Sequence, residues 1–252
     1  MPGWRETDES THKVRSSIQS MGVHFHGFEK LVMRRLFLFG ATETAEVADY
    51  YFSKQSDYTV EAFVVDDGFA SSTSLAGKSV VSFTEYERDL REEEDYFFVA
   101  IGYSKLNRAR AEKFLFLKNR GIRLASFVSP EASVADNVQI GLNVMVLEKN
   151  TLQPFSLIGD NVVIWSGNHL GHHSTVGNHV FISSGVVIAG HSKIEPFCFL
   201  GVNSSIINGS TIGENSVVGA GVNVAEDVPA YSAIVRGQRD KVIPGGARGF
   251  FV

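Results

Sequence analysis

Between residues 33 and 130, apolar runs alternate with stretches that have the spacing of amphipathic helices. The apolar runs are expected to be strands, and they cover residues 35–40, 60–68, 96–102 and 122–130. The expected helices begin near Glu43 and span residues 108–119. Because buried parallel strands alternate with helices in α/β layers, the pattern predicts an N-terminal Rossmann-like α/β domain over residues 33–129.

Two polar segments fall outside this alternation. Residues 1–32 show no regular period and are expected to form an N-terminal extension. The charge-rich segment EYERDLREEED, residues 85–95, is expected to be the solvated face of a helix.

After Pro130 the helical pattern gives way to a six-residue repeat. Every sixth residue from Val134 to Val224 is aliphatic, over sixteen consecutive positions. Two positions earlier in each unit the residue is mostly small, with Asn150 and Asn168 as the exceptions. Such hexapeptides form a parallel β-helix, in which three units make one coil and the aliphatic residue points inward. The pattern predicts about five coils over residues 130–235, followed by a tail at residues 236–252.

Composition narrows the classes of function. The chain has 252 residues, a formal charge of -5 and no basic stripe, so nucleic acid is not an expected partner. No apolar run approaches the ~20 residues that cross a bilayer, and no signal peptide is recognised, so a cytoplasmic location without membrane contact is expected. The single cysteine, Cys198, occupies an inward position of the repeat and is expected to be structural.

The histidines gather in one part of the repeat, at His169, His172, His173, His179 and His191. Because residues 18 apart stack on neighbouring coils, His173 is expected beside His191, and His172 beside Gly190. The β-helical carbonic anhydrases resemble this scaffold and hold zinc with an H-x4-H pair. No pair here is five residues apart, so the spacing argues against that site and no metal is expected. The alternative, that the histidines are solvated surface groups, applies first to His179.

Four motifs carry a resemblance to a known family. HHSTVG at residues 172–177 fits the form H-[DE]-x-x-[IV]-G except at its second position, and Ala-Gly follows at residues 189–190. FLGVN at residues 199–203 and GAG at residues 219–221 complete the set. Together with the α/β domain, they make the chain from residue 34 to about residue 240 resemble the bacterial nucleotide-sugar acetyltransferases that modify bacillosamine or perosamine, and the related sialic-acid O-acetyltransferases. The resemblance implies a left-handed β-helix, a homotrimer with active sites between subunits, and acetyl-CoA as the acyl donor.

The resemblance also implies roles for single residues. His172 takes the place of the general base, a role that a neutral imidazole suits at cytoplasmic pH. His173, its main rival as base, stands where the family has an acidic residue that orients the histidine; that role passes to another group, such as Asn168 or His169, or is absent. Gly190 is expected to stabilise the oxyanion through its amide. Contacts to acetyl-CoA are expected from Ala189, Gly190, Val202, Gly219, Ala220 and Gly221, with Arg236 and Arg239 as candidates for its phosphates.

A nucleotide sugar is implied for the α/β domain. GATETA at residues 40–45 stands where relatives have a glycine-rich turn, VVDD at residues 64–67 keeps the acidic end of the second strand, and AIGYSKLNR at residues 100–108 keeps a glycine and an arginine. Substrate contacts are therefore expected at Gly40, Ala41, Thr42, Asp66, Asp67, Gly102, Tyr103 and Arg108.

The sequence thus predicts an acyltransferase that moves acetyl from acetyl-CoA to the amino group of a nucleotide-linked amino deoxysugar. Three alternatives stay open: O-acetylation of a sugar hydroxyl or sialic acid, a non-catalytic β-helix that binds a sugar nucleotide, and a zinc hydratase. Binding of acetyl-CoA separates the transferases from the other two.

Overall fold

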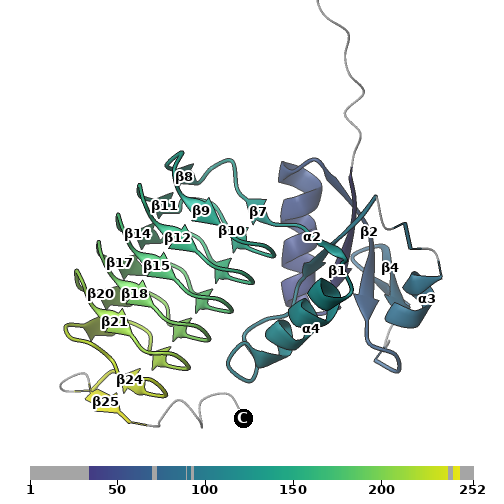
Figure 1. Cartoon of the computed structure of the whole chain (residues 1–252). Coiled ribbons are helices and arrows are strands. Elements are labelled where there is room, and N and C mark those ends of the chain that lie inside the picture. The colour runs from purple at the N-terminus through teal and green to yellow at the C-terminus, as the bar shows by residue number, and fades with distance from the viewer. Residues whose placement is uncertain (1–33, 70–72, 89, 92–93, 238–240, 245–252) are drawn as a thin grey trace, which may run out of the picture. The chain divides into compact units, whose positions relative to one another are not determined.

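A computed structural model describes residues 34–69, 73–88, 90–91, 94–237 and 241–244 (Figure 1). All of them belong to one compact unit, Met33–Val252. The expected extension at residues 1–32 and the candidate phosphate ligand Arg239 lie outside the described residues.

The N-terminal part is built on a six-stranded sheet in the order β3-β4-β2-β1-β5-β6. Its elements are β1 Arg34–Phe39, α2 Glu43–Gln55, β2 Tyr58–Val65, β3 Ser74–Leu75, β4 Lys78–Ser82, α3 Phe83–Glu87, β5 Asp95–Val99, α4 Arg108–Asn119 and β6 Arg123–Leu124. The central strand β1 pairs in parallel with β2 on one side and β5 on the other. One side of the sheet packs on α2 and the other on α3 and α4, so its strands are buried from both faces.

The charge-rich segment differs from its expected structure. Among the described residues of this segment, only those in α3 are helical, and Tyr86 and Asp95 are buried. Asp95 accepts a hydrogen bond from the Tyr86 hydroxyl at 3.1 Å and pairs with Arg35 at 2.8 Å. The expectation of a solvated helix across residues 85–95 is therefore wrong, because a carboxylate can enter the core where a cation and a hydroxyl compensate its lost hydration.

From β7 onward the chain is a parallel β-helix with three faces. Face 1 has the order β25-β24-β22-β19-β16-β13-β10-β7, face 2 has β23-β20-β17-β14-β11-β8, and face 3 has β21-β18-β15-β12-β9. Up to β23, neighbouring strands are 18 residues apart, as in the pairing of Thr151 with His169. The strands are β7 Phe127–Val128, β8 Ser133–Val134, β9 Gln139–Ile140, β10 Met145–Val146, β11 Thr151–Leu152, β12 Leu157–Ile158, β13 Val163–Ile164, β14 His169–Leu170, β15 Thr175–Val176, β16 Phe181–Ile182, β17 Val187–Ile188, β18 Lys193–Ile194, β19 Phe199–Leu200, β20 Ser205–Ile206, β21 Thr211–Ile212, β22 Val217–Val218, β23 Asn223–Val224, β24 Ala233–Val235 and β25 Lys241–Ile243.

The interior confirms the six-residue pattern. The sixteen aliphatic positions form one core cluster, in which all but Val134 and Ile140 at its open end are buried. Cys198 is fully buried in the same cluster, and burial raises the pKa of its thiol to about 12, as expected for a structural cysteine. The run at residues 122–130 is not one strand, because β6 joins the α/β sheet while β7 starts face 1.

Face 1 is covered by the N-terminal part of the chain. Met145 and Leu147 on this face share a core with α2 and the sheet. The amide of Val99 donates to Asn143 Oδ1 at 2.7 Å, which ties the end of β5 to a turn of the β-helix. Faces 2 and 3 meet at the corner opposite face 1 (Figure 1). The turns at that corner contain His172, His173 and His191.

Candidate active site at the histidine corner

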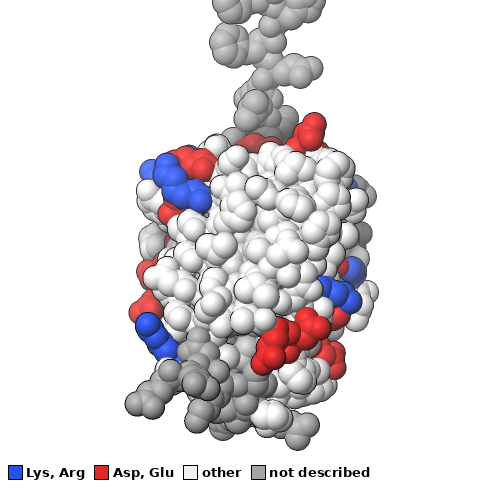
Figure 2. Space-filling model, turned by 90° about the vertical axis from the view of Figure 1, so that its left-hand side faces the viewer, with Lys and Arg blue, Asp and Glu red and all other residues white. Residues whose placement is uncertain are grey.

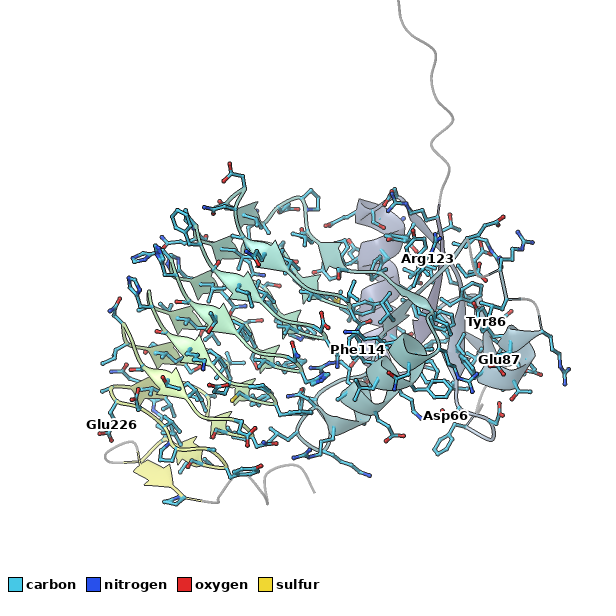
Figure 3. All side chains as sticks on the ribbon, viewed as in Figure 1. Asp66, Tyr86, Glu87, Phe114, Arg123 and Glu226 are labelled. Carbon is cyan, nitrogen blue, oxygen red and sulfur yellow. The ribbon has the colours of Figure 1, made fainter. Side chains whose placement is uncertain are left out.

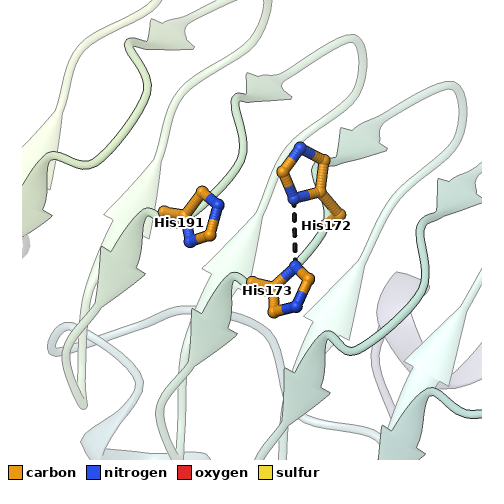
Figure 4. Close-up of side chains that lie close together, drawn as sticks. All are labelled: His172, His173 and His191. Atoms are coloured by element: carbon orange, nitrogen blue, oxygen red, sulfur yellow. Dashed lines mark hydrogen bonds between the residues drawn. The ribbon is translucent and has the colours of Figure 1, made fainter.

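The turns between faces 2 and 3 bring three imidazoles together on two neighbouring coils (Figure 4). His173 and His191 both occupy the left-handed backbone region, with φ of 57° and 59°. Their rings stack at 5.0 Å with 13° between the planes, and Phe155 on the preceding coil continues the column 4.7 Å from His173. The predicted stacking of residues 18 apart is confirmed. We call His172, His173 and His191 the histidine corner.

His172 is held by its backbone and by its neighbour. Its amide donates to Gln153 Oε1 at 3.0 Å, and its carbonyl accepts from the His191 amide at 2.9 Å. Its Nδ1 lies 3.1 Å from Nδ1 of His173. A hydrogen bond between two such nitrogens needs the proton on one and the lone pair on the other. When His172 holds that proton, the lone pair of its Nε2 is free to accept another.

Gly190 lies against His172, and the contact explains why it is a glycine. A Cβ at residue 190 would lie 2.9 Å from both Cε1 and Nε2 of His172. Among the described residues, the Gly190 amide enters no hydrogen bond, so its N–H is available beside the imidazole. An imidazole and a free backbone donor side by side form the elements of a general base and an oxyanion site.

Asn168, one of the candidates named for orienting His172, forms hydrogen bonds inside the β-helix instead. Asn168 is buried, its side-chain oxygen accepts from the Val186 amide at 2.6 Å, and its own amide donates to Asn150 Oδ1 at 2.9 Å. It belongs to an internal asparagine ladder. The Nδ1 atoms of His172 and His173 form a hydrogen-bonded pair, and His173 occupies the place of the family's acidic residue.

His179 is not a solvated surface group, and that expectation is wrong. It is 7% exposed, its Nδ1 lies 2.9 Å from Asn161 Nδ2, and its ring packs between Phe114 and Phe197 at 5.6 and 4.7 Å. Burial and the nearby Arg110 cation lower the pKa of His179 to about 4. Helix α4 covers the corner between faces 3 and 1, where His179 lies. The repeat pattern contains no information about this tertiary contact.

A depression lies in the N-terminal part, beyond the carboxyl ends of β1 and β5. It has a volume of about 890 Å³ and is lined by Gly40, Thr42, Glu43, Thr44, Ile101, Gly102, Tyr103, Ser104 and Lys105. The sheet order reverses between β1 and β5, and ligands of open α/β sheets bind at such a switch point. Four of the expected substrate residues, Gly40, Thr42, Gly102 and Tyr103, meet here, and Ala41 lies between two of them in sequence. We call this depression the sheet-edge pocket.

Three other expected substrate residues do not line it. Asp66 pairs with Lys113 at 2.9 Å, on the side of α4 away from the β-helix (Figure 3). Asp67 accepts from the Thr84 hydroxyl at 2.5 Å and from the Thr84 amide at 3.2 Å, and these bonds lower the pKa of Asp67. Arg108 donates to Asn215 Oδ1 at 2.7 Å, on the β-helix.

The rim of the sheet-edge pocket is fixed to face 1 by residues that sequence reasoning missed. Lys105, Leu106 and Asn107 form a left-handed turn, with φ of 50°, 52° and 66°. Asn107 donates to the Cys198 carbonyl at 3.1 Å, and Tyr103 packs on Phe181 at 4.9 Å. These contacts hold the turn against the β-helix at a local conformational cost.

Arg110 is the second missed residue. It is fully buried, donates to the Gly102 carbonyl at 3.1 Å and to the Val180 carbonyl at 3.2 Å, and thereby joins the pocket rim to the β-helix. Burial lowers the pKa of Arg110 to about 9. In sequence it looks like any solvated arginine of α4, so no signal could have identified it.

The expected acetyl-CoA residues occupy two different corners. Ala189 and Gly190 lie at the histidine corner, between faces 2 and 3. Val202, Gly219, Ala220 and Gly221 lie between faces 1 and 2, where the Gly221 amide donates to the Val202 carbonyl at 2.8 Å. A Cβ at residue 221 would come 3.2 Å from Arg236 Nη1, so Arg236 belongs to this second group. One chain therefore separates the two groups by the width of face 2.

Comparisons with known proteins agree with this architecture. The bacterial transferase hexapeptide (six repeats) family matches residues 155–190 and 191–226. No curated protein matches the chain by sequence. Within the described residues, each helix falls short of the length and apolar character that crossing a membrane requires.

Three solved structures share the fold over most of the chain. PerB from Caulobacter crescentus, in complex with CoA and GDP-perosamine, is 28% identical with a TM-score of 0.73, covering 82% of this chain and 96% of its own. The acetyltransferase domain of PglB from Neisseria gonorrhoeae is 24% identical with a TM-score of 0.74, covering 83% and 100%. WeeI from Acinetobacter baumannii is 21% identical with a TM-score of 0.58, covering 82% and 99%. The resemblance found in the sequence is confirmed, and with it the acyltransferase class.

Proposed function

We propose that this chain is an acetyl-CoA-dependent N-acetyltransferase whose acceptor is the amino group of a nucleotide-linked amino sugar. The observation that carries the proposal is the pairing of His172 with the unbonded Gly190 amide, on a hexapeptide β-helix attached to an α/β sheet with an open pocket. The amino sugar as acceptor is supported by the likeness to PerB, whose structure contains CoA and GDP-perosamine.

In the proposed reaction the acceptor amine attacks the thioester carbonyl of acetyl-CoA. The nitrogen–carbon bond forms as Nε2 of His172 takes a proton from the amine, and the carbonyl electrons move onto oxygen. The Gly190 amide donates to that oxyanion. The intermediate then collapses, the carbon–sulfur bond breaks, and the proton held by His172 passes to the departing thiolate, which leaves as CoA.

His173 serves as the positioning residue in this scheme. Its Nδ1 accepts the Nδ1 proton of His172 at 3.1 Å, which fixes the tautomer whose free lone pair lies at Nε2. Protonation of His173 would remove that lone pair and with it the hydrogen bond. A neutral imidazole therefore does here what an acidic side chain does in the family.

The sheet-edge pocket is the proposed nucleotide site of a Rossmann-like domain. Its walls include the amino end of α2, where backbone N–H groups and the helix dipole favour phosphate. Lys105 adds a cation to the rim, whereas Glu43 in the first turn of α2 adds an opposing carboxylate. A volume of about 890 Å³ accommodates a ligand of nucleotide-sugar size.

The histidine corner and the sheet-edge pocket lie on opposite sides of one β-helix, so an active site that uses both requires more than one subunit. The N-terminal part covers face 1, and the histidine corner is the edge farthest from that face. We therefore propose a cytoplasmic homotrimer in which the histidine corner of one subunit meets the acetyl-CoA residues at the other corner of its neighbour.

Face 2 has the surface that this packing requires. Figure 2 shows a broad region free of lysine, arginine, aspartate and glutamate, with charges along its edges. The first residues of its strands are uncharged in every described case: Ser133, Thr151, His169, Val187, Ser205 and Asn223. Burial of such a face between copies costs little desolvation of charge.

The test is release of free thiol from acetyl-CoA with a panel of GDP-, UDP- and dTDP-linked 3- and 4-amino deoxysugars. Matched sugars with a hydroxyl in place of the amine serve as controls. Turnover with one amino sugar, and none with its hydroxyl counterpart, supports N-acetylation. Turnover restricted to hydroxyl sugars contradicts the proposed acceptor, and failure to bind acetyl-CoA contradicts the enzyme class.

A further inference from the structure

We infer that the histidine corner binds a divalent transition-metal ion through one ring nitrogen each of His172, His173 and His191. One nitrogen from each imidazole can be chosen so that all three lie within 4.8 Å of one another, and all three side chains are exposed. Figure 4 shows the three rings grouped at the surface of adjacent coils. The site shares His172 and His173 with the proposed transfer reaction, which itself needs no metal.

The distances between the imidazole nitrogens fit a small metal ion after a limited movement of one side chain. Two imidazole nitrogens bound to a tetrahedral zinc ion are about 3.3 Å apart, given metal–nitrogen distances near ~2.0 Å. The Nδ1 atoms of His172 and His173 already lie at 3.1 Å. His191 must rotate to close the remaining gap, and its side chain is exposed. Its backbone is fixed by the bond from its amide to the His172 carbonyl at 2.9 Å.

The chemistry of the ligands decides which ions fit. Three neutral imidazoles favour Zn²⁺, Co²⁺, Ni²⁺ and Cu²⁺ over Mg²⁺ and Ca²⁺, which prefer oxygen. Three protein ligands leave a fourth position for water. The side chains that face the ion are otherwise neutral, since Phe155 and Gln153 flank the group on the preceding coil.

The H-x4-H spacing, which this chain lacks, describes a different arrangement, with two ligands five residues apart. In the histidine corner, two adjacent residues combine with a third one coil away. The left-handed conformation of His173 and His191 turns both rings toward the same place. Spacing along the chain does not reveal this convergence.

Occupation of the site would inhibit acetyl transfer, a consequence that rests on the proposed function. A neutral imidazole has one lone pair. When the ion takes it from either nitrogen of His172, the other nitrogen carries the proton and cannot act as base. Metal binding and catalysis therefore exclude each other on the same residue.

In the test, metal-free, full-length protein is titrated with Co²⁺. The visible absorption of Co²⁺ reports its binding by nitrogen ligands at low coordination number. We expect one Co²⁺ per chain, displaced by Zn²⁺ but not by Mg²⁺. His191→Asn keeps a residue that accepts the left-handed backbone, and it is expected to weaken Co²⁺ binding at least 10-fold. His169→Gln changes an imidazole outside the group and is the matched control.

Thiol release with and without Zn²⁺ then separates the two proposals. We expect Zn²⁺ to inhibit the wild type and the His169→Gln variant, and the His191→Asn variant to resist, each rate being compared with that of the same variant without metal. Equal Co²⁺ affinity in wild type and His191→Asn overturns the metal site and leaves the transferase proposal untouched. Binding of Co²⁺ at the site without inhibition upholds the metal site and counts against His172 as the base.

Discussion

Replacement of Gly190 by alanine tests the contact on which the proposed site depends. The added Cβ would lie 2.9 Å from Cε1 and Nε2 of His172 and 3.2 Å from its carbonyl oxygen. Ordinary contacts of this kind are 3.4 Å or longer, so the imidazole must move by at least about 0.5 Å. The φ of Gly190 lies outside the left-handed range, so the strain comes from this contact and not from the backbone.

The two consequences of this movement differ in size. His172 is exposed and can swing away, so we expect the free energy of unfolding to change by no more than ~1 kcal/mol. Displacement of a catalytic group by an ångström or less costs about 10²-fold in rate, which corresponds to ~2.7 kcal/mol of transition-state stabilisation. We therefore expect kcat to fall by about two orders of magnitude and the KM for acetyl-CoA to change only a few-fold.

The assay is steady-state thiol release, paired with thermal unfolding of the same preparations. Gly209→Asn is the matched control, because Gly209 has φ of 77°, a value asparagine accepts, and a Cβ there would have nothing within 4 Å. We expect the control to keep wild-type activity. A Gly190→Ala enzyme within three-fold of wild type in kcat would refute the argument that the imidazole and the amide of residue 190 act together.

Three further predictions concern other parts of the chain. His173→Asp is expected to keep or raise kcat, because a carboxylate also accepts the Nδ1 proton of His172. His173→Gly is expected to lower kcat about 10-fold with little change in KM. Equal kcat values in steady-state assays of the two variants would contradict the positioning role of His173. His179 has a folded-state pKa of about 4, below its unfolded value near ~6.5. Its neutral form therefore contributes about 3 kcal/mol to the free energy of unfolding; this contribution is complete above pH ~6.5 and lost as the pH falls toward 4. His179→Asn places a third asparagine beside Asn143 and Asn161. The free energy of unfolding of this variant, measured in urea, should depend less on pH between pH 6.5 and 5 than that of the wild type. The same pH dependence in both proteins would contradict the assignment to His179. In the sheet-edge pocket, Glu43→Gln should lower and Lys105→Gln should raise the KM for the nucleotide sugar several-fold, and shifts of the same sign would argue against phosphate binding there.

The repeat was readable from the sequence because each residue's environment is set by its position in the coil. An inward position has the same surroundings on every coil, so the aliphatic period alone identified the buried residues from Leu152 to Val224. The stacking of His173 on His191 and the contact of His172 with Gly190 follow from the same 18-residue shift.

What the sequence did not reveal depends on tertiary contacts that the repeat pattern does not contain. His179 has the sequence neighbourhood of a surface turn, but α4 covers it with Phe114. Arg110 and Asp95 look solvated and are buried, because carbonyl groups or an arginine compensate their charge. Arg108 matched a family motif, yet its partner is Asn215 on the β-helix. Sequence periodicity contains no information about such pairings.

The most direct test of the central claim is a single-turnover measurement of acetyl transfer by wild type and His172→Ala, with acetyl-CoA affinity measured separately for each. The account predicts that transfer slows by 10²-fold or more while the affinity for acetyl-CoA stays within about two-fold, because His172 acts on the proton of the acceptor. Transfer at a rate close to wild type in His172→Ala would contradict the assignment of His172 as the base.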